Sequence, residues 1–243
     1  MKIKIINPDF DMTREQMDMR EEMLKKAARP DTFISMDCPH NNNICIDSLT
    51  DAALASAEII KMAVEAEKEG YDAVGIYCLS DPGITACREL LKIPVLGGGQ
   101  TAFQVACGLG YSFSLITTSD NRIPEKKEFV RTTGADPSRL CSIRSINTSL
   151  SSIRKNRDEV IKNIIKAAEK CAEDGAEVII LGCLSFAGMG KEVSEAVGLP
   201  VVDPAFALIN MAELLYSQGL SHSKRSYPFP PKMKRIWGKG EID

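Results

Sequence analysis

A repeated strand and turn constrains the fold of this 243-residue chain more than any other feature. Residues 70–80 read GYDAVGIYCLS, and residues 175–185, which lie 105 positions later, read GAEVIILGCLS. In each copy a glycine follows a helical pattern, an apolar strand comes next, and Cys-Leu-Ser leads into another helix. The opening strand at residues 2–7 also has a counterpart at residues 112–117. The repeat predicts two similar lobes related by a pseudo-twofold axis.

Short β-branched runs alternate with longer amphipathic stretches in both halves. The predicted strands lie at residues 2–7, 32–36, 73–77, 95–96, 112–117, 141–146, 178–181 and 201–202, and the main helices at residues 12–28, 51–69, 158–173 and 205–217. This alternation predicts an α/β fold in which each lobe is a mostly parallel four-stranded sheet flanked by helices, with a cleft between the lobes. We place the lobes at residues 1–110 and 111–217 and a C-terminal tail at residues 218–243, allowing for an exchange of elements between the lobes.

Charge and hydropathy exclude several classes of partner. The net charge is −3 and basic residues concentrate only in the tail, so nucleic acid is not expected as a partner. No apolar run approaches the roughly 18 residues that span a bilayer, and the first residues read as a strand rather than a signal peptide. We therefore expect a cytoplasmic protein without a membrane partner. The tail, including His222, is expected to be solvated.

The eight cysteines are expected to be reduced thiols, because a cytoplasmic setting is predicted for a chain of this size, and no CxxC pair occurs. Cys38, His40 and Cys45 resemble part of a metal site but lack a fourth ligand at the usual spacing, so we predict no metal. Four other cysteines are interpreted as small core residues, namely Cys87, Cys107, Cys141 and Cys171.

Cys78 and Cys183 stand apart because each follows a predicted strand. Functional groups in open parallel sheets lie at the carboxyl ends of strands, so the pseudo-symmetry should set these two thiols on opposite walls of the cleft. Each also precedes a helix that we expect to be capped by Ser80 or Asp81 in the first copy and by Ser185 in the second. The partial positive charge of a helix N-terminus should lower a thiol pKa toward neutrality, and its free backbone N–H groups should bind an anionic oxygen.

Two thiols on opposite faces of one carbon predict inversion of that carbon. One thiolate removes a proton next to a carbonyl, and the other thiol returns a proton to the opposite face. No cofactor is needed: no lysine stands at a strand end to form a Schiff base, and the glycines at 97–99 lack the spacing of a dinucleotide-binding motif. The competing interpretation is that both cysteines are ordinary buried residues.

Five segments of the chain together resemble the Asp/Glu/hydantoin racemase superfamily, nearest its hydantoin racemase branch. They are the opening Ile6-Asn7-Pro8, the Cys78-to-Gly83 turn, the glycine-rich segment at 96–102, the strand end at Thr118 and the Gly182-Cys183 turn. The resemblance covers residues 1–217. It implies cofactor-free racemisation with Cys78 and Cys183 as the acid/base pair. Our candidate substrate-binding residues are Asn7, Ser80, Asp81, Gln100, Thr117, Thr118 and Ser185.

We therefore predict an isomerase, a racemase or epimerase acting on a hydantoin or amino-acid-like small acid, that is, on a small anionic or cyclic amide substrate. The resemblance also implies a homo-oligomer. Residues 38–46 and Gln100 depart from the hydantoin branch, which leaves the substrate open. The alternatives are an enzyme like maleate cis–trans isomerase or arylmalonate decarboxylase, or a non-catalytic small-molecule binding protein. The decarboxylases retain one cysteine, so the presence of two argues against that alternative, whereas maleate isomerases retain two and stay an open alternative.

Overall fold

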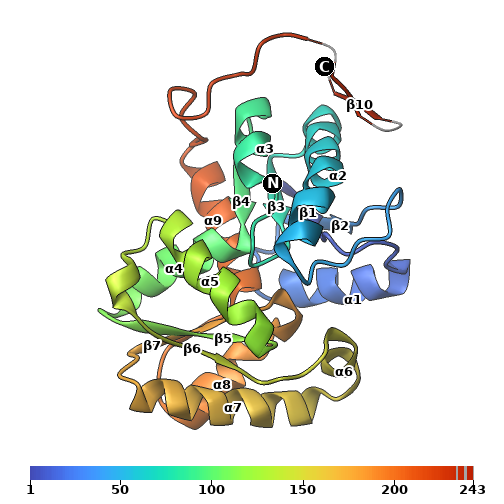
Figure 1. The fold of residues 1–243 in the computed structure, drawn as a ribbon. Helices are drawn as coiled ribbons and strands as arrows, with labels where there is room; N and C mark the ends of the chain where they lie inside the picture. The colour runs from blue at the N-terminus through green and yellow to red at the C-terminus, as the bar shows by residue number, and fades with distance from the viewer. Residues whose placement is uncertain (234, 238–239, 243) are drawn as a thin grey trace.

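The chain forms two four-stranded parallel sheets and, near the C-terminus, a two-stranded antiparallel hairpin (Figure 1). The computed structural model describes residues 1–233, 235–237 and 240–242. The first sheet has the strand order β2-β1-β3-β4, and the second has the order β6-β5-β7-β8. Because the two orders correspond strand for strand, the predicted fold class is confirmed.

The strands of the two sheets begin and end within one residue of their predicted limits. They are β1 (Lys2–Ile6), β2 (Phe33–Asp37), β3 (Ala73–Ile76), β4 (Val95–Gly97), β5 (Phe113–Thr117), β6 (Leu140–Ser145), β7 (Val178–Leu181) and β8 (Val201–Val202). Every residue of β3, β5 and β7 is buried, which is why these strands read as continuous apolar runs rather than alternating ones.

Helices connect the strands and cover both sheets. They are α1 (Arg14–Lys25), α2 (Leu49–Lys68), α3 (Ile84–Leu90), α4 (Gly98–Leu109), α5 (Ile123–Thr132), α6 (Leu150–Lys155), α7 (Arg157–Glu173), α8 (Gly190–Val197) and α9 (Pro204–Ser217). The repeated glycines at the ends of α2 and α7 have left-handed backbones, with φ of 79° at Gly70 and 96° at Gly175. That conformation ends a helix at little steric cost only for glycine, so both predicted helix ends are confirmed.

One hydrophobic cluster contains residues of both sheets and so joins them. α4, which follows the first sheet, packs against β7 and β8, whereas α9, at the end of the second half, packs against β3 and β4. The approach of α9 is close, because a β-carbon at Gly75 of β3 would lie 2.6 Å from the Leu208 side chain. These crossed helices fix the two sheets relative to each other. The division into lobes at residue 110 stays a prediction.

The cysteines outside the two repeated turns differ in burial. Cys87 and Cys171 are fully buried, as predicted for core residues. Cys107 is only partly buried, and Cys141 is exposed, so the core assignment is wrong for Cys141. Cys141 lies in β6, an edge strand whose residues are mostly half-exposed.

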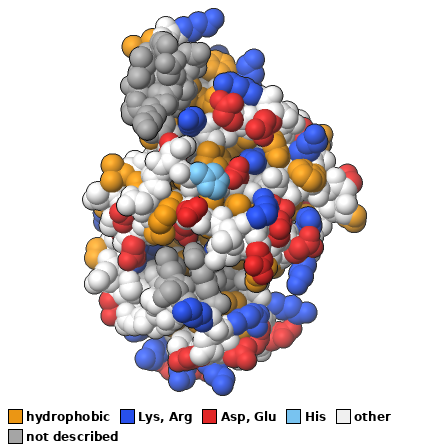
Figure 2. Space-filling model, turned by 90° about the vertical axis from the view of Figure 1, so that its right-hand side faces the viewer, with side chains coloured by type: hydrophobic (Ala, Val, Ile, Leu, Met, Phe, Trp, Pro, Cys, Tyr) orange, Lys and Arg blue, Asp and Glu red, His pale blue; other side chains and the backbone are white. Residues whose placement is uncertain are grey.

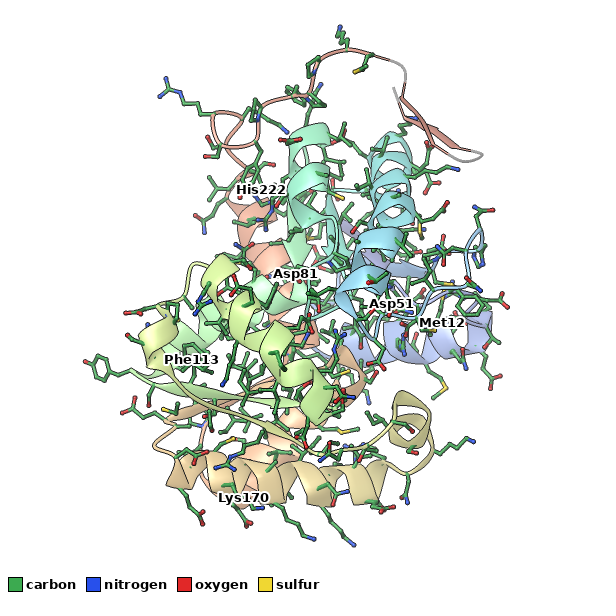
Figure 3. The ribbon with its side chains drawn as sticks, in the orientation of Figure 1. Met12, Asp51, Asp81, Phe113, Lys170 and His222 are labelled. Carbon is green, nitrogen blue, oxygen red and sulfur yellow. The ribbon has the colours of Figure 1, made fainter. Side chains whose placement is uncertain are left out.

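The tail packs on the first sheet instead of extending into solvent. The backbone N–H of Val95 donates to Nε2 of His222 over 2.9 Å, which satisfies a donor on the edge strand β4. Nζ of Lys224 donates to three carbonyl oxygens at the end of α3, those of Arg88, Glu89 and Leu91. The solvated interpretation of His222 is therefore wrong (Figure 3). The hairpin β9 (Arg235–Trp237) and β10 (Gly240–Ile242) was not predicted, and residues 234, 238–239 and 243 of the predicted tail lie outside the described residues.

Acidic and basic side chains are interspersed on the face shown in Figure 2, in keeping with the small net charge. Among the described residues, no helix is both long enough and apolar enough to cross a membrane.

Candidate active site

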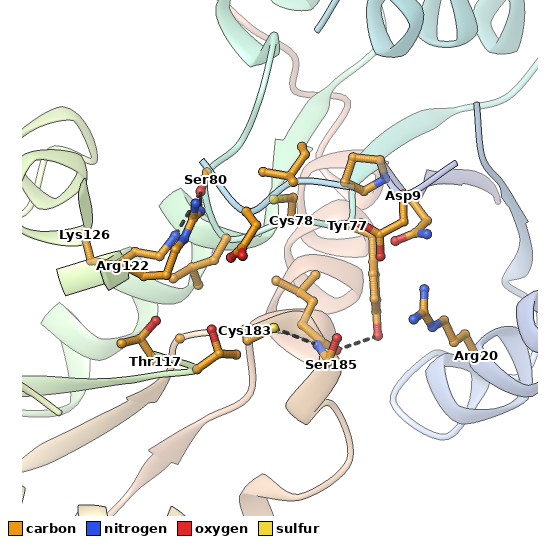
Figure 4. A pocket seen from close by; sticks show the side chains of 18 residues that line it. Asp9, Arg20, Tyr77, Cys78, Ser80, Thr117, Arg122, Lys126, Cys183 and Ser185 are labelled. Carbon is orange, nitrogen blue, oxygen red and sulfur yellow. Dashed lines mark hydrogen bonds between the residues drawn. The ribbon is translucent and has the colours of Figure 1, made fainter. Parts of the chain in front are cut away.

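A pocket lies where the turns after β1, β3, β5 and β7 meet at the carboxyl ends of the two sheets (Figure 4). Cys78 comes two residues after β3, and Cys183 comes two residues after β7. Both side chains line the pocket, from the wall of one sheet and from the wall of the other. The space between the walls is about 590 Å³, part of which is open to solvent. The structure thus brings together the two thiols that the repeat singled out.

Most of the other predicted residues line the same pocket. Asn7 follows β1 and Thr117 ends β5, and both are almost fully buried. The remaining predicted residues on the walls are Ser80, Thr118 and Ser185. Their convergence follows from the parallel sheets, because the carboxyl ends of parallel strands lie at one edge.

Asp81 and Gln100 are not among the described residues that line the pocket. The buried carboxylate of Asp81 accepts hydrogen bonds from the backbone N–H groups of Gly99 and Gln100, over 2.9 and 2.6 Å. Asp81 therefore caps α4, which begins 17 residues later in the chain, and not the helix that follows it. α3 instead begins after Gly83, which makes no side-chain cap, so the prediction that Ser80 or Asp81 caps this helix is wrong.

The glycine run before α4 makes room for the Cys78 turn. A β-carbon at Gly97 would lie 2.2 Å from the Asp81 carboxyl carbon, and one at Gly99 would lie 2.0 Å from the Leu79 carbonyl oxygen. Both distances are far below van der Waals contact. The turn that carries Cys78 thus packs directly against the start of α4.

The Cys183 turn has a different local structure. Residues Leu184–Phe186 form a single 3₁₀ turn, and the Cys183 sulfur accepts a hydrogen bond from the Ser185 N–H over 3.4 Å. The next helix, α8, begins only at Gly190, so the prediction that Ser185 caps it is wrong. Here the thiol itself takes the capping position.

Burial dominates the acidity of both thiols. Desolvation raises the pKa of Cys78 to about 12, although the ammonium of Lys126 lowers it. Burial also raises the pKa of Cys183, against the N–H of Ser185 and Lys126, which both lower it. The expectation of thiol pKa values near neutrality is therefore wrong. A thiolate on either wall needs further stabilisation when it forms.

A buried ionic cluster on the pocket wall was not predicted. Arg122 pairs with Glu125 over 2.8 Å, and Lys126 pairs with the other oxygen of Glu125 over 3.2 Å. Ser80 joins the cluster, because its hydroxyl donates to Glu125 over 2.6 Å and accepts from Lys126 over 2.9 Å. In the sequence Glu125 and Lys126 belong to a charged stretch at residues 124–128, PEKKE, which reads as the exposed face of a helix. We find no local signal that distinguishes Lys126 from Lys127.

Two further lining residues were also missed. The Tyr77 hydroxyl donates to the Leu184 carbonyl oxygen over 3.1 Å and so links the two cysteine turns. The guanidinium of Arg20, from α1, lies 5.4 Å from the centre of the Tyr77 ring. The position of Tyr77 directly before Cys78 was a usable signal, whereas that of Arg20 was not.

The end of β2 and the loop after it bring ligand atoms of Asp37, Cys38 and His40 within 4.8 Å of one another. Cys45, which was grouped with Cys38 and His40 from the sequence, does not belong to this cluster of described residues. The Lys4 ammonium lies 3.3 Å from the Asp37 carboxylate, and its positive charge opposes the binding of a cation there.

The arrangement is suited to proton transfer at one carbon from two sides. Sulfur atoms lie on both walls, hydroxyl and amide side chains supply polar contacts, and Lys126 supplies positive charge near both thiols. Such positive charge stabilises a thiolate or a developing oxyanion.

The comparisons with known proteins agree with this geometry. The model of the Asp/Glu/Hydantoin racemase family matches residues 3–212. A hydantoin racemase from Rhizobium meliloti is 32% identical over 233 residues, which is 95% of each chain. A hydantoin racemase from Paenarthrobacter aurescens is 32% identical over 241 residues, covering 97% of this chain and 100% of the relative. The crystal structure of an allantoin racemase from Pseudomonas fluorescens superimposes with a TM-score of 0.89 at 28% identity, covering 98% of this chain and 100% of that one.

Proposed function

The chain belongs to the Asp/Glu/hydantoin racemase family and is an isomerase of the racemase type, and we propose that it inverts its substrate with Cys78 and Cys183 and without a cofactor. The observation that carries this proposal is that both sulfur atoms border one pocket from opposite walls. One sulfur atom can take the proton from one face of a carbon held between them, and the planar carbanion that results can be protonated on the other face.

In the proposed reaction, one cysteine thiolate takes the proton from the carbon next to a carbonyl. The C–H bond breaks, an S–H bond forms, and the electron pair moves to the carbonyl oxygen as an enolate. The opposite thiol then donates its proton to the other face, and the carbonyl is restored. The enzyme ends with its two thiols in exchanged protonation states, so the next turnover runs in the reverse direction or awaits proton exchange with water.

The raised thiol pKa values fit a reaction in which the bound substrate itself helps to stabilise the thiolate. Burial favours the protonated form of both sulfur atoms. The Ser185 N–H and the Lys126 ammonium already favour negative charge on the sulfur atoms, and polar groups of a bound substrate add to that effect. Substrate binding and thiolate formation are therefore coupled in this proposal.

We propose a cyclic amide of the hydantoin type, or a related amino-acid-like acid, as the substrate. Relatives that match almost the full chain carry the names hydantoin racemase and allantoin racemase. In a hydantoin the carbon between the ring amide nitrogen and the ring carbonyl is acidified by that carbonyl, as this mechanism needs. The side chains of Asn7, Thr117 and Ser185 offer donors and acceptors to ring amide groups.

The test is the rate of optical inversion of single enantiomers of 5-substituted hydantoins by Cys78→Ser and Cys183→Ser. Removal of an acid/base group should slow each variant by about 100-fold or more. Cys141→Ser is the matched control, since Cys141 is exposed on β6 and is not one of the described lining residues. Retention of the full rate by either active-site variant would rule out the two-cysteine mechanism.

A further inference from the structure

The ionic cluster of Arg122, Glu125 and Lys126 carries more positive than negative charge. Two cations share the single carboxylate of Glu125, and the three side chains are only 4 to 10% exposed. An uncompensated buried charge is costly, because the protein replaces water poorly around it. Two cations with one carboxylate stabilise the fold less than one cation with one carboxylate would. Stability of the fold therefore does not explain why the second cation is buried here.

The cluster faces the pocket and is held in place there. Arg122 and Lys126 are both lining residues, at the start of α5 (Figure 4). Ser80, two residues after Cys78, bridges Glu125 and Lys126. In the part of the chain that the structure describes, the hydrogen bonds of Lys126 account for two of its three N–H donors. A substrate beside Cys78 therefore lies within reach of a fixed ammonium group.

The other acidic groups near the pocket do not cancel this charge. Asp47 is exposed, and Asp9, whose charge acts on both thiols, and Asp51, whose carboxylate interacts with Arg122, are partly exposed, so water weakens the field of all three carboxylates. The carboxylate of Asp81 is turned toward the backbone N–H groups at the start of α4. The buried part of the wall thus presents net positive charge.

We propose that Arg122 and Lys126 bind a carboxylate on the substrate, so that the preferred substrate is a cyclic amide whose substituent on the inverted carbon ends in an acid. This inference rests on the two-cysteine function and specifies its substrate class. The Arg122 guanidinium and the Lys126 ammonium can both donate hydrogen bonds to a carboxylate. Their ion pairs with Glu125 hold both groups in position before the substrate binds. The alternative is that Lys126 acts only on the reacting atoms, and it would then serve every substrate equally.

A matched pair of substrates separates the two roles. Hydantoin-5-acetic acid and its primary amide have nearly the same shape and differ in charge. We expect the wild-type kcat/KM to be about tenfold or more higher for the acid than for the amide. Lys126→Met should lower kcat/KM for both compounds, because the ammonium also favours thiolate formation, but the loss should be about ten- to 100-fold larger for the acid than for the amide. Lys126→Arg should retain the preference for the acid.

Lys127→Met is the control, because Lys127 is the exposed neighbour on the same helix. Equal losses for acid and amide in Lys126→Met, or no wild-type preference for the acid, would overturn the carboxylate site while leaving racemisation intact. Calorimetric binding of the same two compounds tests the site without turnover. Weaker binding of the acid alone in Lys126→Met supports the site, and unchanged binding overturns it. Lack of inversion with every hydantoin tried would instead count against the proposed reaction.

If Lys126→Met does not fold, as judged by circular dichroism, Arg122→Gln provides the same comparison from the other cation. The expected result is again a selective loss for the acid, and an equal loss for both compounds would overturn the proposal.

Discussion

Replacement of Gly99 by alanine tests how the fold supports the Cys78 turn. The added β-carbon would lie 2.0 Å from the Leu79 carbonyl oxygen and 2.6 Å from the Phe129 ring. The ring can shift, but the carbonyl belongs to the backbone next to Cys78 and moves only with the turn. Overpacking of this kind costs about 1–3 kcal/mol, and the better helix propensity of alanine offsets up to about 1 kcal/mol. We expect a net loss of about 2 kcal/mol in the free energy of unfolding.

The same helix provides a control of opposite sign. Gly108, near the other end of α4, is exposed, and a β-carbon there would have no atom within 4 Å. Gly108→Ala should therefore stabilise the protein by up to about 1 kcal/mol. For a chain of this size the melting temperature should fall by about 4–8 °C in Gly99→Ala and rise by about 1–4 °C in Gly108→Ala.

The assay is thermal unfolding followed by circular dichroism, combined with the rate of inversion. Gly99→Ala should also lose activity, because the Leu79 shift moves Cys78, whereas Gly108→Ala should retain it. A Gly99→Ala protein as stable and active as the wild type would refute the close seating of the Cys78 turn on α4.

Two predictions concern the tail. Lys224→Met removes the donors to the last carbonyl groups of α3 and should destabilise the protein by about 1–3 kcal/mol in urea unfolding, whereas Lys232→Met, at an exposed position, should have little effect. Burial lowers the pKa of His222 to about 4, from 6.5, so the folded protein resists a proton that the unfolded chain accepts. Stability should therefore fall as the pH drops from about 6.5 to about 4, by at most about 3 kcal/mol, and then level off. His222→Gln should flatten this slope, and an unchanged slope would show that other groups cause it.

The fold could be predicted from the sequence because its strands and helix ends are marked by nearby residues and the same marks occur in both halves of the chain. Runs of valine and isoleucine mark the buried strands, and Gly70 and Gly175 mark equivalent helix ends. The two cysteines could be found for the same reason, since each follows one of the repeated strands. Pseudo-symmetry then predicted that they lie on facing walls.

The errors arose where a side chain has a partner far away in the chain. Asp81 was expected to cap the helix next to it but caps α4, and His222 binds Val95 at a separation of 127 residues. Lys126 looks like its neighbour Lys127 until the fold turns it toward Ser80. The thiol pKa values were misjudged because burial, which depends on the whole fold, outweighs the local helix field.

The central claim is that two separate thiols handle the proton on the two faces of one carbon. The most direct measurement is deuterium content at early times in deuterated water, starting from one enantiomer of a 5-substituted hydantoin. Two acid/base groups predict that the inverted product carries solvent deuterium at the inverted carbon while the recovered starting enantiomer retains its original hydrogen. Deuterium in the recovered starting enantiomer, together with original hydrogen in the product, would mean that one group serves both faces and would contradict the account.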